Sequence, residues 1–259
     1  MLVTRTCKLC RRERELCESH IIPEFVYAPL YDEGGKMVGF RFGEKGIRSR
    51  LLQMGLREPL LCAECEQLIN HDYEQPNVAF WRSLAAHESA LEPSWTPFTA
   101  PSGDSGVFVR GADYSSFKLF LLSMLWRASV SALPEFHDVR LGPYEEPIRR
   151  MLLERSPGTK ADYPCIVFLF KEPGAILPPK RQRANGHLMY HFILTTVQVW
   201  IFVSGHVSQE RIISMAIRED GCFPALFMDP RETKLFKAMH DVERETKHSA
   251  SVLRRFEEN

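Results

Sequence analysis

The sequence has no excess of charge of either sign, because its 33 lysines and arginines are balanced by 33 aspartates and glutamates. A bulk positive field is therefore excluded, and any contact with a nucleic-acid backbone must come from a local patch. The chain also lacks a Gly-rich phosphate-binding loop, a nucleophile elbow and a kinase signature. These absences argue against P-loop NTPases, α/β-hydrolases and protein kinases.

Long hydrophobic runs are missing as well. The two longest, residues 117–133 and 188–203, are interrupted by polar residues such as Arg127 and Gln198, whereas a membrane helix needs about 20 apolar residues in a row. The N-terminal residues turn polar at once and contain no apolar segment of a secretory signal. We therefore expect a cytoplasmic protein with a buried core and no membrane partner.

Cysteine is scarce, with seven residues in 259, yet four of them form two Cys-x-x-Cys pairs, Cys7 with Cys10 and Cys62 with Cys65. In a chain without a secretory signal, such pairs favour a metal site over disulfides. Each turn aims two sulfurs at one point, and two turns complete the tetrahedral sulfur shell that zinc prefers. The sequence predicts a structural Zn²⁺ site that is closed to substrate and holds up the residues between the pairs.

Two stretches accompany these pairs: "ESHIIPEF" (Glu18–Phe25) follows the first, and "LLCAECE" (Leu60–Glu66) contains the second. Together they resemble the zinc-stabilised branch of the HNH, or His-Me finger, endonucleases, as seen in the N-terminal region of a group of bacterial proteins. The resemblance covers about residues 5–75. It implies a treble-clef or ββα-like module, in which zinc braces a hairpin followed by a helix, and a nuclease that hydrolyses phosphodiester bonds in DNA or another nucleic acid.

By the same resemblance, His20 is the general base that activates water, since an imidazole titrates near neutral pH. A divalent cation, Mg²⁺ or Mn²⁺, neutralises charge on the scissile phosphate. Glu66 and Asn70, on the helix that starts at the second cysteine pair, are the candidates to complete the catalytic site. Glu66 is suited to bind the hard cation.

The sequence departs from the family pattern at three positions. Ser19 precedes His20 where the family has Asp or Glu, Glu66 stands where it has Asn or His, and no Asn occurs near residues 57–60. In an alternative interpretation, His20 hydrogen-bonds a backbone carbonyl inside the zinc fold. The chain is then a catalytically inactive zinc-binding protein that binds nucleic acid or a protein partner.

A basic stretch, Gly39–Arg50, lies between the cysteine pairs. It mixes two phenylalanines with cations, and the candidates for contact with nucleic acid are Arg41, Lys45, Arg48 and Arg50. Such a stretch can lie along a phosphate backbone, where each neutralised phosphate releases counterions. A solvated hairpin surface explains the pattern equally well. A second basic stretch, Lys180–Arg183, is expected to be a solvated loop.

The order of segments predicts the α+β class, with three regions. Residues 1–90 form the zinc-binding module, residues 91–114 are a Pro-, Gly- and Ser-rich connector, and residues 115–259 form a larger mixed α+β domain. The cysteines outside the pairs are expected to be buried as small hydrophobic residues: Cys17, Cys165 and Cys222.

Within the C-terminal region, we expect a central buried helix that is capped by Ser115 or Ser116 and ends near Leu133. A second helix is expected over residues 143–154 and a strand over residues 163–170. The apolar stretch of residues 187–203 is too long for one ordinary strand, and we place its break at Thr195–Thr196. A last helix is expected to start at Asp229.

Overall fold

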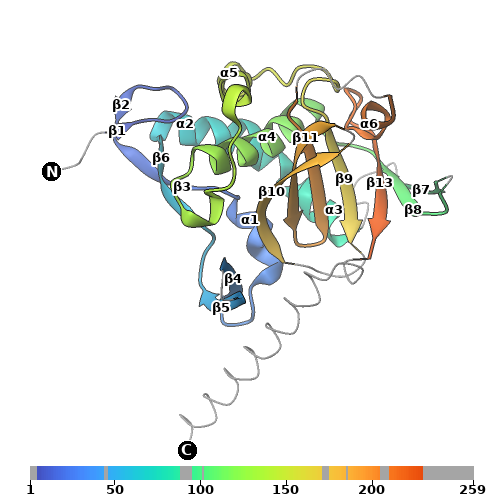
Figure 1. Cartoon of the computed structure of the whole chain (residues 1–259), viewed down its shortest axis with the longest axis horizontal. Helices are drawn as coiled ribbons and strands as arrows, with labels where there is room; N and C mark the ends of the chain where they lie inside the picture. Colours follow the sequence, from blue (N-terminus) through green and yellow to red (C-terminus); the bar gives the residue numbers. More distant parts are fainter. Residues whose placement is uncertain are drawn as a thin grey trace, which may run out of the picture.

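The computed structural model describes residues 5–43, 46–87, 95–100, 102–170, 175–184, 186–204 and 210–229. It is a mixed α+β structure built around one large sheet and one buried helix (Figure 1). The strands are β1 (Arg5–Thr6), β2 (Glu13–Arg14), β3 (Leu16–His20), β4 (Met37–Gly43), β5 (Gly46–Leu52), β6 (Arg57–Cys62), β7 (Thr96–Thr99), β8 (Ser105–Val109), β9 (Cys165–Phe170), β10 (Ile176–Ala184), β11 (His187–Leu194), β12 (Val197–Phe202) and β13 (Phe223–Met228). The helices are α1 (Glu24–Tyr27), α2 (Ala63–Leu68), α3 (Val78–Ala86), α4 (Tyr114–Val130), α5 (Glu145–Glu154) and α6 (Glu210–Met215).

The large sheet has seven strands in the order β10-β11-β12-β9-β13-β8-β7. All neighbours are antiparallel except β9 and β13, which run parallel. One face of the sheet, with Val167 and Val199, packs on α4, and the other face, with Phe168, packs on Ile212 of α6. β9 is buried along its whole length because it is covered on both faces.

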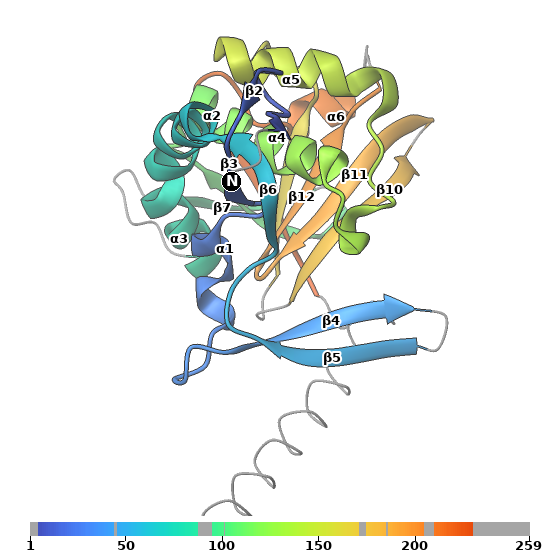
Figure 2. The same ribbon diagram turned by 90° about the vertical axis from the view of Figure 1, so that its left-hand side faces the viewer.

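The helix α4 lies at the centre of the molecule, between the sheet and the helices α2 and α3 (Figures 1 and 2). Fourteen of its 17 residues are buried, which confirms the expected central helix. Its cap differs from the prediction: the side chain of Asp113 accepts a hydrogen bond of 2.7 Å from the backbone N–H of Ser116. Asp113 reaches that N–H from the N-cap position, whereas Ser116 itself is already inside the helix.

The hairpin of β11 and β12 confirms the predicted break, since Thr195 and Thr196 form its two-residue turn. Thr195 has a φ of 62°, an unfavourable conformation for a β-branched residue. The turn is held by its surroundings: Thr196 Oγ1 donates to the carbonyl of Ala85 at 2.6 Å, and Thr195 N donates to the carbonyl of Ala175 at 3.2 Å. Tertiary contacts therefore replace the turn residues that usually mark a hairpin.

Two predicted loops contain strands. Lys180–Arg183 lies in β10, so the expectation of a loop there is wrong. β10 is an edge strand, and its two prolines fall where the register with β11 shifts between Leu177 and Lys180, as is usual for proline in sheets. Residues 91–114, expected to be a connector, contribute β7 and β8 to the sheet.

The hydrophobic core is continuous from the cysteine-rich N-terminal part to the large sheet, and includes Leu61, Tyr73, Phe120 and Val199. The helix expected over residues 143–154 is present as α5, and the strand expected over residues 163–170 is present as β9. The helix expected from Asp229 lies outside the described residues. Within the described part of the chain, the search for a helix of sufficient length and apolarity to cross a bilayer found none.

Gly221 offers a test of this packing. Its φ is +73°, and a Cβ there would lie 2.0 Å from the backbone oxygen of Ala112, just before α4. Gly221→Ala should lower the free energy of unfolding by about 3 kcal/mol, because strain and backbone displacement add. Gly35→Ala is the control, since Gly35 has a φ of +68° and nothing within 4 Å of an added Cβ. It should cost about 1 kcal/mol. Equal effects in urea unfolding would contradict the close approach.

Candidate metal centre and active site

The four paired cysteines converge in space. The sulfurs of Cys7, Cys10, Cys62 and Cys65 all lie within 4.8 Å of one another, and within the described residues these are the one such group of His, Cys, Asp or Glu. All four cysteines are free, and the Sγ atoms of Cys10 and Cys62 lie 3.8 Å apart. A disulfide would bring two sulfurs to about 2.05 Å. The cluster can hold a metal ion, as the spacing predicts.

Each pair is shaped by a tight local structure. The first occupies the turn between β1 and β2, where Cys7 N donates to Arg12 O and Arg11 N to Cys7 O, both at 2.9 Å. The second begins α2, with Cys62 as its N-cap residue. The backbone N–H of Cys62 donates to Cys7 Sγ at 3.3 Å, which joins the two turns.

The shared environment shifts the thiol pKa values in opposite directions. A hydrogen bond with Cys65 lowers the pKa of Cys7 to about 4. The same bond, together with burial, raises the pKa of Cys65. The cluster therefore favours one thiolate that the neighbouring thiols stabilise. Because every sulfur must lose its proton to bind a cation, metal affinity at this site should fall in acid.

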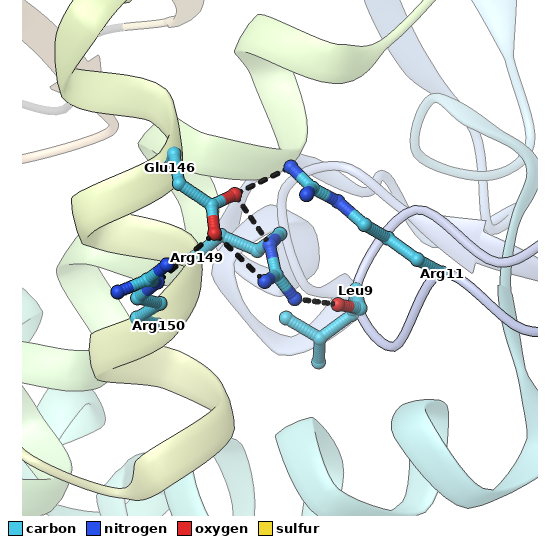
Figure 3. A network of polar contacts seen from close by, with 5 residues as sticks. All are labelled: Leu9, Arg11, Glu146, Arg149 and Arg150. Atoms are coloured by element: carbon cyan, nitrogen blue, oxygen red, sulfur yellow. Dashed lines mark hydrogen bonds and ion pairs between the residues drawn. The ribbon is translucent and has the colours of Figure 1, made fainter.

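The helix α5 braces the first cysteine turn (Figure 3). Arg149 donates from Nη1 to the carbonyl of Leu9, between the two cysteines, and pairs with Glu146 at 2.8 Å. Glu146 also pairs with Arg11, and the hydrogen bond from Arg149 is the main reason that the pKa of Glu146 falls to about 2. The Arg149 cation lies near Cys10 and so offsets negative charge on a metal-bound thiolate cluster.

A cavity of about 680 Å³ lies beside the cysteine cluster, between the end of β3 with α1 and the helices α2 and α3. His20, Glu66 and Asn70 all line it, so the structure brings the three candidate catalytic residues together. Five of the lining residues recur every four positions along the helices: Glu66, Asn70, Glu74, Val78 and Arg82. This stripe is acidic near His20 and ends in an exposed arginine.

His20 is the last residue of β3, where it pairs with Arg57 of β6. Its Nε2 lies 3.2 Å from Glu24 Oε2, and its side chain is 28% exposed. Glu24 is itself fixed, because Oε2 accepts from Gly55 N at 3.1 Å and Oε1 accepts from the Tyr31 hydroxyl. Sequence reasoning missed Glu24, although an acidic residue directly after Pro23, four positions beyond His20, was a usable signal.

Ser19 is fully buried and holds Glu66. Its hydroxyl donates to Glu66 Oε2 at 2.5 Å and accepts from Leu61 N at 3.3 Å. Burial raises the pKa of Glu66, while the Ser19 bond and the nearby Arg127 act in the opposite direction. The residue before His20 thus supports a carboxylate on the facing helix instead of supplying one.

Arg127 reaches the site from α4, although the sequence showed it only as an interruption of an apolar run. Its side chain is 1% exposed and pairs from Nη2 with Glu74 Oε1 at 2.8 Å. Nη1 donates to the backbone carbonyl of His20 at 2.8 Å. Arg127 therefore contacts both walls of the cavity from behind.

The basic stretch forms the hairpin of β4 and β5, an arm that projects from the body of the molecule (Figure 2). Its register pairs Arg41 with Arg48 and Gly39 with Arg50, while Lys45 lies outside the described residues.

The cysteines outside the cluster were all expected to be buried, and this expectation is only partly correct. Cys165 is buried, but Cys17, which lines the cavity, and Cys222 are half-buried. Cys17 stays accessible because it borders the cavity, and Cys222 because it lies in the turn that precedes β13.

Comparisons with protein-family models, curated proteins and solved structures find no match to this chain.

Cys62→Ser should abolish binding of the ion. Serine lacks the soft thiolate, and metal binding contributes to folding at such sites. We expect loss of one equivalent of bound metal per chain in elemental analysis, with a fall in melting temperature of about 10 °C or more, since structural metal sites commonly supply several kcal/mol. Cys222→Ser, outside the cluster, should keep both. Full metal content in Cys62→Ser would contradict the assignment.

Proposed function

We propose that the cysteine cluster binds Zn²⁺ and that the adjacent cavity is the active site of a metal-dependent nuclease of the HNH type. The observation that carries the proposal is the placement of His20, paired with Glu24, opposite Glu66 and Asn70 across a cavity open to water. A histidine oriented by a carboxylate is a common general base. Two carboxylates on the facing helix, Glu66 and Glu74, offer oxygen ligands for a hard cation.

Zinc is supported by distance and by chemistry. A tetrahedron with Zn–S bonds of about 2.3 Å has sulfur–sulfur edges of about 3.8 Å, and Cys10 and Cys62 are separated by 3.8 Å. Thiolates favour zinc over hard cations. Four cysteines leave no open coordination position, so this ion ties the turn between β1 and β2 to the start of α2, in a treble-clef-like arrangement.

In the proposed mechanism, His20 accepts a proton from a water molecule that attacks the scissile phosphodiester. Glu24 occupies the Nε2 side of the ring, so the proton is taken at Nδ1. Glu24 then stabilises the imidazolium that forms. Mg²⁺ or Mn²⁺, when bound, would neutralise the negative charge on the phosphate and on the leaving oxygen.

The number and type of these carboxylates suit a hard cation. Mg²⁺ commonly takes one or two carboxylates and fills its shell with waters and substrate phosphate oxygens. Glu66 is held by Ser19, and Glu74 by Arg127. Arg82 lines the cavity at the far end of the stripe, and in this proposal it contacts a neighbouring phosphate.

The alternative function is a zinc-braced binding protein, for nucleic acid or a protein partner, that lacks catalysis. The observation in its favour is Ser19, which stands where the family supplies an acidic ligand. In our proposal Glu66 takes over that ligand role from the facing helix. An assay of activity separates the two functions.

Incubation of supercoiled plasmid with Mg²⁺ or Mn²⁺ should give nicked and linear products. His20→Ala should slow cleavage by about 100-fold or more, the usual worth of a general base, with unchanged zinc content. His137→Ala, which replaces an exposed histidine outside the cavity, should retain wild-type activity. A wild-type protein that cleaves no DNA or RNA substrate under broad conditions would favour the binding protein.

Binding should depend on salt through the β4–β5 arm. Removing two phosphate contacts should lower the slope of log affinity against log salt by about 2. We expect this result for Arg41→Gln/Arg48→Gln in gel-shift titrations of the His20→Ala background with duplex DNA. Arg218→Gln, a control at an exposed arginine paired with Asp220, should leave the slope unchanged. A wild-type affinity that is insensitive to salt would argue against any phosphate contact.

A further inference from the structure

We propose that Arg127 is a positioning residue of the active site, contributed by the central helix α4, which sets His20 and Glu74 at a fixed separation across the cavity. The inference rests on the proposed function, which assigns the chemistry to His20. It adds a role for the part of the chain that lies outside the cysteine-braced hairpin and helix.

The burial of Arg127 requires an explanation. Its side chain is 1% exposed on a helix whose buried residues are mostly apolar, and a buried guanidinium is costly unless it is fully paired. The hydrogen bonds and the ion pair of Arg127 lead either to the site or back to its own helix. Nε donates to Ser123 O and Nη2 to Ser123 Oγ, both at 3.3 Å, which orients the planar group toward the cavity.

The two outward contacts lie on opposite walls. Nη1 donates to the carbonyl of His20 at 2.8 Å, and Nη2 pairs with Glu74 at 2.8 Å. His20 ends β3, and Glu74 ends the π-helical segment Ile69–Glu74 that continues α2. Because guanidinium is rigid and planar, its two bonds fix the strand end and the helical segment relative to each other.

Arg127 binds the His20 carbonyl at the point where β3 ends. Directly beyond it, Ile21 N donates to Leu56 O at 3.0 Å and the Ile21 side chain is buried, so these contacts fix the residue after His20, whereas Arg127 holds the His20 carbonyl itself. A shift of the His20 backbone would move the imidazole away from Glu24. Without Arg127, we expect the histidine to lose its fixed orientation while the cysteine cluster stays intact.

The test compares Arg127→Met, Glu74→Gln and the double variant with a control, Arg218→Met. Each is measured for zinc content and melting temperature. Activity is measured as kcat and as the Mn²⁺ concentration that gives half-maximal rate. Independently of activity, the His20 ring nitrogens are followed by ¹H–¹⁵N correlation NMR as pH is varied, with the signals assigned from His20→Ala.

We expect Arg127→Met to lower kcat by about 10- to 100-fold, as is usual for loss of an outer-shell partner, and to change the His20 titration and tautomer signals. Glu74→Gln should mainly raise the Mn²⁺ requirement. The double variant has no unpaired buried charge, but it still lacks the contact with His20. Its melting temperature should therefore return toward that of wild type, while its kcat stays low. Arg218→Met should match wild type throughout.

A folded, zinc-loaded Arg127→Met with wild-type His20 signals would overturn the inference. Should Arg127→Met fail to fold, Arg127→Lys decides, because lysine keeps the charge but not the two-pronged geometry. Unchanged His20 signals in Arg127→Lys would overturn the positioning role, and altered signals would support it. If wild type cleaves nothing, the proposed nuclease fails, while the NMR comparison still decides the role of Arg127.

Discussion

The convergence of Cys7, Cys10, Cys62 and Cys65 ties together two segments that are distant in sequence, and the position of His20 follows from it. The strand β3 starts after the first pair, and α2 starts at the second. With both fixed, the register from Leu16 opposite Cys62 to His20 opposite Arg57 leaves the histidine facing the helical stripe. An ion bound at the cluster would therefore influence the cavity only by fixing the positions of these segments.

The cysteine-rich part does not stand alone. Arg149 holds the first cysteine turn, and the hydroxyl of Tyr73 donates to Leu152 O at 2.5 Å, so α5 supports both ends of the cysteine-rich part. Arg127 adds a contact from the core helix to each wall of the cavity. Buried ion pairs are weak sources of stability, and this one is better understood as a geometric restraint than as a stabilising contact.

Local patterns were enough to predict the cysteine cluster, the central helix, β9 and the break at Thr195–Thr196. Each depends on spacing or apolar periodicity within a short stretch. Glu24, Ser19 and Arg127 acquire their roles through contacts with distant residues, namely Gly55, Glu66 and Glu74, which no local pattern reveals. The strands in residues 91–114 and Lys180–Arg183 were missed for a related reason: proline and charge are tolerated at the edges of a sheet.

The arm of β4 and β5 enters and leaves the body at one place, because Met37 pairs with Leu52 at its base and both pack against the core. Lengthening a segment whose two ends are held together costs little folding free energy, about 0.6 kcal/mol for each doubling of a flexible loop. Evolution can therefore extend, trim or replace the arm without disturbing the cysteine-rich part. The sequence of the arm and the residues that line the cavity are thus free to change independently.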